Sequence, residues 1–402
     1  MKPRLIALTM LAFTAAAVAV YPALRVTPAA TPPIATLAPN TQPLGSQHPR
    51  IEVAFVLDTT GSMGGLIESA KEKIWSVAST MASAQPAPEI RIGLVAYRDR
   101  QDAYITRVVD LSTDLDSMYA TLMDFQAEGG GDGPESVNQA LYDAVNGLSW
   151  SQDPQTYRVI FLVGDAPPHM DYQNDVKWPQ TLETARTRGI RVNAIQCGRN
   201  GATTTAWRQI ALAGKGSYFQ VGQAGSAVAI VTPFDERLAK LSADLDSTRL
   251  YYGSAADRAR QQRKLEATDK LHSEASVASR ARRAAFNASG SGKANLLGEK
   301  ELVEGVGSGR VDLDSVPRAE LPAPMQAMPA AEQKALIKQT AQRRAKLTKE
   351  VQALAKQRAD FLKRKVQERG GAKDSLDAGI YRAVREQGAA AGLHYNADAP
   401  SY

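Results

Sequence analysis

The amino-acid sequence predicts a doubly wound α/β fold with a mainly parallel sheet, followed by an α-helical C-terminal region. Between residues 51 and 242, short apolar runs rich in β-branched residues alternate with segments of helical spacing. The runs are almost continuously apolar, which is typical of parallel strands covered by helices on both faces. From residue 250 onward, the sequence is charged and helix-prone.

The alternation assigns the elements in order. Strands are expected at Ile51–Asp58, Ile90–Tyr97, Tyr157–Gly164, Ile190–Gln196 and Ser217–Gln220. Tyr104–Leu111 alternates in polarity, so we expect it to pair beside the second strand as a hairpin partner. Helices are expected at Gly64–Ala84, Leu115–Phe125, Ser136–Leu148, Thr181–Arg188, Thr203–Ala213 and Ala224–Leu241.

The composition excludes several classes of protein. The 402 residues are 44% apolar and 22% charged, an ordinary globular mixture with room for two or three domains. The single cysteine, Cys197, excludes an intramolecular disulfide and a zinc site built from cysteines. The four histidines lie too far apart in sequence for a local zinc motif.

Charge is distributed unevenly along the chain. The net charge of +6 combines −3 over residues 1–249 with +9 over residues 250–402. The basic part has few aromatic residues and no nucleic-acid motif, so we expect no nucleic-acid partner and interpret its charge as a solvated helical face. The basic cluster Lys363–Lys365 is the place where anionic lipid could bind.

The N-terminus has the pattern of a targeting segment. Lys2 and Arg4 precede the apolar run Leu5–Val20, as in a signal peptide, and Ala17–Ala19 could serve as the cleavage site. An uncleaved signal anchor in the membrane is the alternative. Residues 21–49 contain seven prolines and are expected to form an extended linker. We therefore expect an exported protein of a bacterial periplasm or cell envelope, secreted or anchored.

Oxygen-bearing side chains collect in three loops of the expected sheet. Asp58, Thr60 and Ser62 follow the first strand, Asp165 ends the strand Tyr157–Gly164, and Glu135 closes a glycine-rich loop. Ligands of α/β folds bind at the carboxyl ends of the strands, and glycines can fold the middle loop over the same edge. Carboxylate and hydroxyl oxygens suit Mg²⁺, with Mn²⁺ and Ca²⁺ as alternatives.

The segments DTTGSM, GGGDGPE and VGDAPPH, in this order, resemble the von Willebrand factor A domain and its metal-ion-dependent adhesion site. The resemblance covers residues 51 to about 242 and implies a Rossmann-like sheet. Asp58, Thr60 and Ser62 match the family's D-x-S/T-x-S motif, and Asp165 matches its last acidic ligand. The middle loop is similar to the integrin β-subunit version, which implies that Glu135 contacts the central metal.

The same resemblance implies a second cation beside the first, held by Asp132 and Asp99. The third integrin-type cation is not expected, because Gly64 and Gly65 occupy the places of its acidic ligands. The family further implies a function in which the metal leaves one coordination place open for a carboxylate of a protein partner. We expect such a binding module, which is not an enzyme.

Two other functions are compatible with the sequence. In a metal-dependent hydrolase, Asp132 or His169 would activate a metal-bound water. In a helical scaffold of the cell envelope, the C-terminal region would carry the function and the metal site would be incidental. His169 lies four residues after Asp165, but no nucleophile accompanies it at a suitable spacing.

The A domain is expected to span residues 50–245, and the helical region residues 246–402. Tyr251–Phe286 is helix-prone, a flexible break is expected near 287–330, Glu332–Arg369 forms a long helix, and Ser375–Leu393 forms a short one. The long helix has a half-polar seam, which could form a coiled coil between copies of the chain or could pack within one chain. The residues of this seam are Leu347, Val351, Leu354, Arg358, Phe361 and Lys365.

Overall fold

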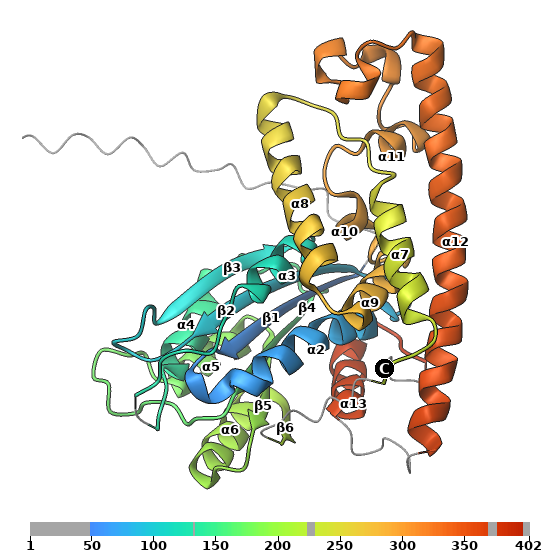
Figure 1. Cartoon of the computed structure of the whole chain (residues 1–402). Helices are drawn as coiled ribbons and strands as arrows, with labels where there is room; N and C mark the ends of the chain where they lie inside the picture. The colour runs from blue at the N-terminus through green and yellow to red at the C-terminus, as the bar shows by residue number, and fades with distance from the viewer. Residues whose placement is uncertain (1–48, 132, 223–229, 369–375, 397–402) are drawn as a thin grey trace, which may run out of the picture. The chain divides into compact units, whose positions relative to one another are not determined.

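A six-stranded sheet with the strand order β3-β2-β1-β4-β5-β6 lies at the centre of the computed structural model, which describes residues 49–131, 133–222, 230–368 and 376–396 (Figure 1). All neighbouring strands are parallel except β3, which pairs antiparallel with β2. The mainly parallel sheet and the hairpin partner are as the sequence predicts. The strands are β1 (Arg50–Asp58), β2 (Glu89–Tyr97), β3 (Thr106–Ser112), β4 (Tyr157–Gly164), β5 (Ile190–Cys197) and β6 (Lys215–Val221).

Helices cover both faces of the sheet because successive strand residues point to opposite faces and both sets are apolar. On one face, Val53, Phe55 and Leu57 pack under α2 (Gly64–Ala82) and α3 (Leu115–Met123). The opposite face is covered by three helices, α4 (Val137–Gly147), α5 (Trp178–Thr187) and α6 (Gly201–Ala213). The doubly wound fold is therefore confirmed.

The helix after β6 differs from the prediction. Helix α7 runs from Asp235 to Asp246, whereas the sequence pattern indicated a start at Ala224. Residues 223–229 lie outside the described part of the chain, and residues 230–232 are not helical. The helix starts where it does because the carboxylate of Asp235 accepts hydrogen bonds from the backbone N–H and hydroxyl of Thr232, both at 2.9 Å.

The C-terminal helix α13 (Leu376–Gly388) returns to the sheet and lies beside α2 and β6 (Figure 1). Ile380 and Val384 are buried in the same apolar cluster as the strand residues under α2. At its end, Gln387 accepts a hydrogen bond of 2.8 Å from Tyr157. Residues near the end of the chain thus cover a sheet that begins at residue 50, and the chain from His48 onward forms one compact unit.

The remaining helices form an arm attached to the sheet domain. The arm contains α7, α8 (Ala255–Glu274), α9 (Val277–Asn287), α10 (Lys293–Leu297), α11 (Leu302–Gly307) and the 39-residue α12 (Ala330–Glu368). The stretch Tyr251–Phe286, which the sequence indicated as helix-prone, contains the two helices α8 and α9. The hydroxyl of Ser276 accepts a hydrogen bond from the backbone N–H of Ser279 and caps the second of them.

The stretch expected to be a flexible break contains a small core of its own. Residues 298–330 form α11 and three short 3-10 turns. Their apolar side chains pack together with those of α12 and leave little surface exposed: Leu302, Val303, Leu313, Leu321, Met325 and Ile337. The glycines and prolines of this stretch therefore make turns in a packed structure.

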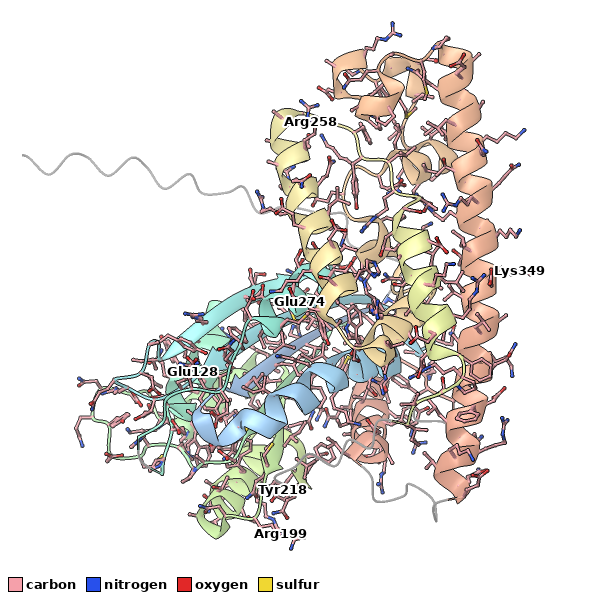
Figure 2. All side chains as sticks on the ribbon, in the orientation of Figure 1. Glu128, Arg199, Tyr218, Arg258, Glu274 and Lys349 are labelled. Atoms are coloured by element: carbon pink, nitrogen blue, oxygen red, sulfur yellow. The ribbon has the colours of Figure 1, made fainter. Side chains whose placement is uncertain are left out.

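The half-polar seam of α12 packs within the chain. Val351 is fully buried in a cluster with residues of α7 and α9. The guanidinium of Arg358 lies 2.6 Å from the carboxylate of Asp235, and the ring of Phe361 meets Phe234 edge to face. The opposite side of the helix is exposed, as the outward side chain of Lys349 shows in Figure 2. An intramolecular partner therefore accounts for both the apolar and the polar positions of the seam.

A buried group of charged side chains joins the arm to the sheet domain. Arg283 of α9 is fully buried between Asp116 of α3, at 2.5 Å, and Asp246 of α7, at 2.7 Å. Burial raises the pKa of the Asp116 carboxyl, but the cations Arg283, Lys264 and Arg249 together lower it below the usual range. The guanidinium of Arg283 thus links helices α3, α7 and α9 in one buried group of charges.

The predicted targeting segment and linker, residues 1–48, lie outside the described residues. Within the part of the chain that the structure describes, none of the helices combines the length and the apolar character that crossing a membrane requires.

We expect Arg283→Met to lower the free energy of unfolding by about 3–5 kcal/mol, because it removes the guanidinium that bridges two buried carboxylates. The other cations beside them are farther away, with Lys264 at 3.7 Å from Asp116 and Arg249 at 3.6 Å from Asp246. Urea denaturation measures the change. Arg186→Ala, which breaks the exposed pair with Glu183, is the control and should cost less than about 1 kcal/mol. Adding Asp116→Asn and Asp246→Asn to Arg283→Met should recover part of the loss. A triple variant as unstable as the single one would show that charge is not the cause.

Ile380→Ala in α13 should destabilise the whole sheet domain by about 2–5 kcal/mol, since it opens a cavity in the core shared with β1 and β4. Thermal unfolding, followed by the near-ultraviolet signal of the sheet-domain tryptophans, measures the effect. Glu386→Ala, on the exposed side of the same helix, should change stability by less than about 0.5 kcal/mol. An unchanged midpoint for Ile380→Ala would contradict the role of α13 as a cover of the sheet.

Candidate metal centre

The turn after β1 brings the first three predicted ligands together. One carboxylate oxygen of Asp58 accepts hydrogen bonds from the backbone N–H of Thr60, at 2.9 Å, and from its hydroxyl, at 2.7 Å. The hydroxyl oxygens of Thr60 and Ser62 are 3.3 Å apart. Asp58 and Thr60 are buried, whereas Ser62 is exposed at the surface. The turn thus arranges the oxygen atoms of these three side chains in a row that runs from the interior of the protein to its surface.

Asp165 joins this row from the neighbouring strand β4. The hydroxyl of Ser62 donates a hydrogen bond of 3.0 Å to its carboxylate. The loop backbone is held by α6, because the Thr203 hydroxyl donates to the carbonyl of Asp165 at 2.9 Å and the Trp207 indole donates to the carbonyl of Ala166 at 3.0 Å. These contacts fix the loop to a packed helix and so fix the position of the carboxylate.

The glycine-rich loop folds over the same edge, as predicted. The backbone N–H of Gly61 donates to the carbonyl of Gly129 at 3.1 Å, and Gly129 and Gly130 have φ angles of +76° and +78°, which favour glycine. A methyl group on Gly130 would lie 3.2 Å from both the Glu135 carboxylate and the Cβ of Thr60. Glu135 therefore lies beside Thr60, and the loop makes room for it.

The carboxyl groups of this cluster are buried close to one another. Burial, together with the charge of Asp165, raises the pKa of Asp58 to about 7, although hydrogen bonds from Thr60 oppose the shift. Burial, together with the charges of Asp58, Asp99, Asp102 and Asp165, raises the pKa of Glu135 to about 9. The second carboxylate oxygens of Asp58 and Glu135 are buried without a hydrogen-bond partner in the described structure.

These observations fit a cation. A buried carboxylate is unfavourable unless it is paired with a positive charge, and two unpartnered oxygens next to two hydroxyls form a set of hard ligands. Within the described residues, no three side chains of His, Cys, Asp or Glu lie close enough to hold a metal by themselves. A cation at this place would also take the hydroxyls of Thr60 and Ser62 as ligands.

Of the two residues predicted to hold a second cation, the structure describes one. Asp132 lies outside the described residues. Asp99 is buried, and its two carboxylate oxygens accept hydrogen bonds from the hydroxyls of Ser136, at 2.8 Å, and Tyr172, at 2.6 Å. The Asp99 carboxylate thus anchors the two loops that also carry Glu135 and Asp165.

His169 is part of the same loop anchor. Its ring stacks on Tyr172 with 3.9 Å between the centroids. One ring nitrogen lies 2.8 Å from the carboxylate of Asp171 and the other 3.4 Å from that of Asp99. Its backbone N–H donates to the carbonyl of Glu135 at 3.1 Å. Only 4% of the His169 side chain is exposed, so the ring packs the loop together.

The sequence analysis missed two residues of the site. Tyr97, the last residue of β2, lies across the ladder from Asp58, and its phenol is fully buried. Gly164, the last residue of β4, has no side chain because a methyl group there would come within 2.4 Å of the Tyr97 hydroxyl. The only sequence signal for these two residues was their position, since Tyr97 ends β2 and Gly164 ends β4, the two strands that flank β1.

The von Willebrand factor A domain family matches residues 52–232 of this chain, and these residues form such a domain. A domain of this family mediates metal-dependent protein interactions in many proteins. The resemblance found in the sequence motifs is therefore confirmed, and the observed sheet order and helical layers agree with it.

The similar proteins match part of this chain. An ariadne-like RING finger protein of Acanthamoeba polyphaga mimivirus is 27% identical over 119 residues, and the alpha-protein kinase vwkA of Dictyostelium discoideum is 28% identical over 121. Each match covers 30% of this chain, and 11% and 19% of those proteins. The mussel byssus protein PTMP1, solved with a zinc-occupied MIDAS motif, is 15% identical over 43% of this chain and 42% of its own, with a TM-score of 0.35.

The raised pKa values predict how stability depends on pH when metal is removed. The folded, chelator-treated protein keeps protons on Asp58 and Glu135 that the unfolded chain has already released above about pH 4, so stability should fall as pH rises from about 5 to about 9. Thermal denaturation across this range measures the slope. Asp58→Asn combined with Glu135→Gln should flatten it, and an equally steep slope in that variant would contradict the assignment.

Proposed function

We propose that this von Willebrand factor A domain holds one divalent cation at the carboxyl edge of its sheet and binds a protein partner through a carboxylate of that partner. The observation that carries the proposal is the pair of buried carboxylate oxygens of Asp58 and Glu135, which lack hydrogen-bond partners beside the hydroxyls of Thr60 and Ser62. Such a site is stable when a cation offsets the buried charge.

The five side chains that would hold the ion, directly or through water, are Asp58, Thr60, Ser62, Glu135 and Asp165. When bound, the ion supplies a Lewis-acidic position that an anionic oxygen of the partner can occupy. The exposed Ser62 is the point where this row of oxygens reaches the surface. The partner would approach from that side, since the Asp58 end of the row is buried.

We propose Mg²⁺ as the ion, with Mn²⁺ and Ca²⁺ as substitutes. All five side chains offer oxygen, the ligand that these hard cations prefer. Burial, together with the charges of Asp165 and Asp58, raises the pKa of the Cys197 thiol.

The contacts of His169 support binding rather than hydrolysis as the function. A general base needs a ring nitrogen that can reach a water molecule at the metal. In this structure the ring is buried, stacked on Tyr172 and flanked by the carboxylates of Asp171 and Asp99. We therefore propose a non-enzymatic binding module.

We further propose that the domain works outside the cytoplasm. The support is the sequence of the N-terminus, in which Lys2 and Arg4 precede the apolar run Leu5–Val20 and a proline-rich linker follows. The exposed basic side of α12 would then face the envelope or a neighbouring protein, and an N-terminal anchor would hold the domain near the membrane.

Asp58→Asn should abolish binding of Mg²⁺ in calorimetric titration, because it removes the charge of the ligand that lies deepest in the site. The wild-type chain should bind the ion with close to one ion per protein. Asp244→Asn, in the arm, is the matched control and should bind like the wild type. The absence of saturable binding in the wild-type chain would contradict the proposed site.

The same variants test the capture of a partner. Immobilised wild-type protein should retain partner proteins from an envelope extract in Mg²⁺ and release them when a chelator is added, whereas Asp58→Asn should not retain them. Retention that resists the chelator and is equal in Asp58→Asn would favour a scaffold that acts through its helices. Metal-dependent cleavage of phosphate esters by the wild type would favour the hydrolase.

A further inference from the structure

A buried tyrosine lies under the candidate metal centre. Tyr97 ends β2 directly opposite Asp58, and its backbone carbonyl accepts hydrogen bonds from the N–H and the hydroxyl of Thr59, both at 2.9 Å. The side chain is fully buried, and the phenol oxygen has no hydrogen-bond partner in the described residues. A phenol without an acceptor is unusual at such depth, because buried hydroxyls are normally paired.

The phenol oxygen and the Asp58 carboxylate border the same place beside Gly164, although they are not hydrogen-bonded to each other in this structure. A methyl group on Gly164 would be 2.4 Å from the Tyr97 hydroxyl and 3.0 Å from the Asp58 carboxylate oxygen that Thr60 leaves free. Both oxygens therefore border the same small space, which exists because Gly164 has no side chain. Burial raises the pKa of the Tyr97 phenol, and the Asp58 carboxylate raises it further, which keeps the phenol a hydrogen-bond donor.

The two groups complement each other. The phenol needs an acceptor, and the free oxygen of Asp58 needs a donor or a cation. A phenylalanine would fill the same space without a buried polar atom, so the hydroxyl has no packing role of its own. Donors that hydrogen-bond to a metal's ligands orient those ligands and alter the affinity of the site for the metal.

We propose that Tyr97 is a positioning residue of the cation site: when the cation is bound, its phenol donates a hydrogen bond to the Asp58 carboxylate and holds that carboxylate in place. This role rests on the proposed function, in which Asp58 is a ligand. Gly164 leaves the space that the phenol occupies, since any larger residue there would displace it. The sequence pair Tyr97 and Gly164 thus belongs to the site although neither residue touches the ion.

The test compares Tyr97→Phe with the wild-type full chain, using Mg²⁺ and Mn²⁺ as probes. We expect Tyr97→Phe to weaken cation binding by about 10-fold to 100-fold in calorimetric titration, the usual effect of losing a hydrogen-bond partner of a metal ligand. The melting temperature of the chelator-treated protein should stay the same or rise, because in the absence of the cation the variant removes a buried hydroxyl that has no acceptor. A tyrosine that only fills space would leave cation binding unchanged.

Tyr157→Phe is the matched control. Tyr157 is also buried in the sheet, but its hydroxyl donates to Gln387 at 2.8 Å, at the end of β4 remote from Gly164. This variant should lower the melting temperature and leave cation binding unchanged.

The outcomes separate the two proposals. Wild-type binding with Tyr97→Phe within twofold of it would overturn the role of Tyr97 and leave the metal site intact. A lower melting temperature of chelator-treated Tyr97→Phe, matching that of Tyr157→Phe, would also overturn it, because the phenol would then have a structural partner. The absence of cation binding by the wild type would contradict both the proposed function and the role of Tyr97.

Discussion

A parallel sheet has to be covered on both faces, and most of this structure follows from that requirement. The chain up to β6 supplies three helices for one face but only α2 and α3 for the other. Helix α7 leaves the sheet and joins the arm, so the missing cover comes from α13, close to the end of the chain. The arm is therefore an insertion between the sheet and the helix that completes it, and both depend on one core.

The arm is held to the sheet domain by charge as well as by apolar contact. A fully buried guanidinium is tolerated only where carboxylates pair with it, and Arg283 receives them from α3 and α7 at once. This arrangement favours one docking position, because a shift of α9 would separate the Arg283 guanidinium from the two buried carboxylates. The arm is thus docked on the sheet domain through this buried group of charges as well as through apolar contacts.

Features that depend on local sequence patterns were predictable, whereas features that depend on contacts between residues far apart in sequence were not. Strands β1, β2, β4 and β5 were predictable, because each is a short apolar run, and so was the meeting of the loops that carry Asp58, Glu135 and Asp165 at one edge. The start of α7 and the return of α13 were not, since both depend on contacts between residues far apart in sequence. Tyr97 and Gly164 were missed for the same reason: each residue type is common at a strand end, and only their approach across β1 makes them part of the site.

The candidate site is assembled at a cost to stability that a binding partner can offset. Loops anchored by α6 and by Asp99 force carboxyl groups together in a place that water does not reach, which raises the pKa values of Asp58 and Glu135. A fold that only needed to be stable would place apolar or neutral side chains there. The cost is confined to one edge because the strands that carry these loops are fixed by the core on both faces. The sheet would therefore preorganise the proposed ligands, and the free energy that the buried carboxyl groups cost in the metal-free state would contribute to affinity for a cation.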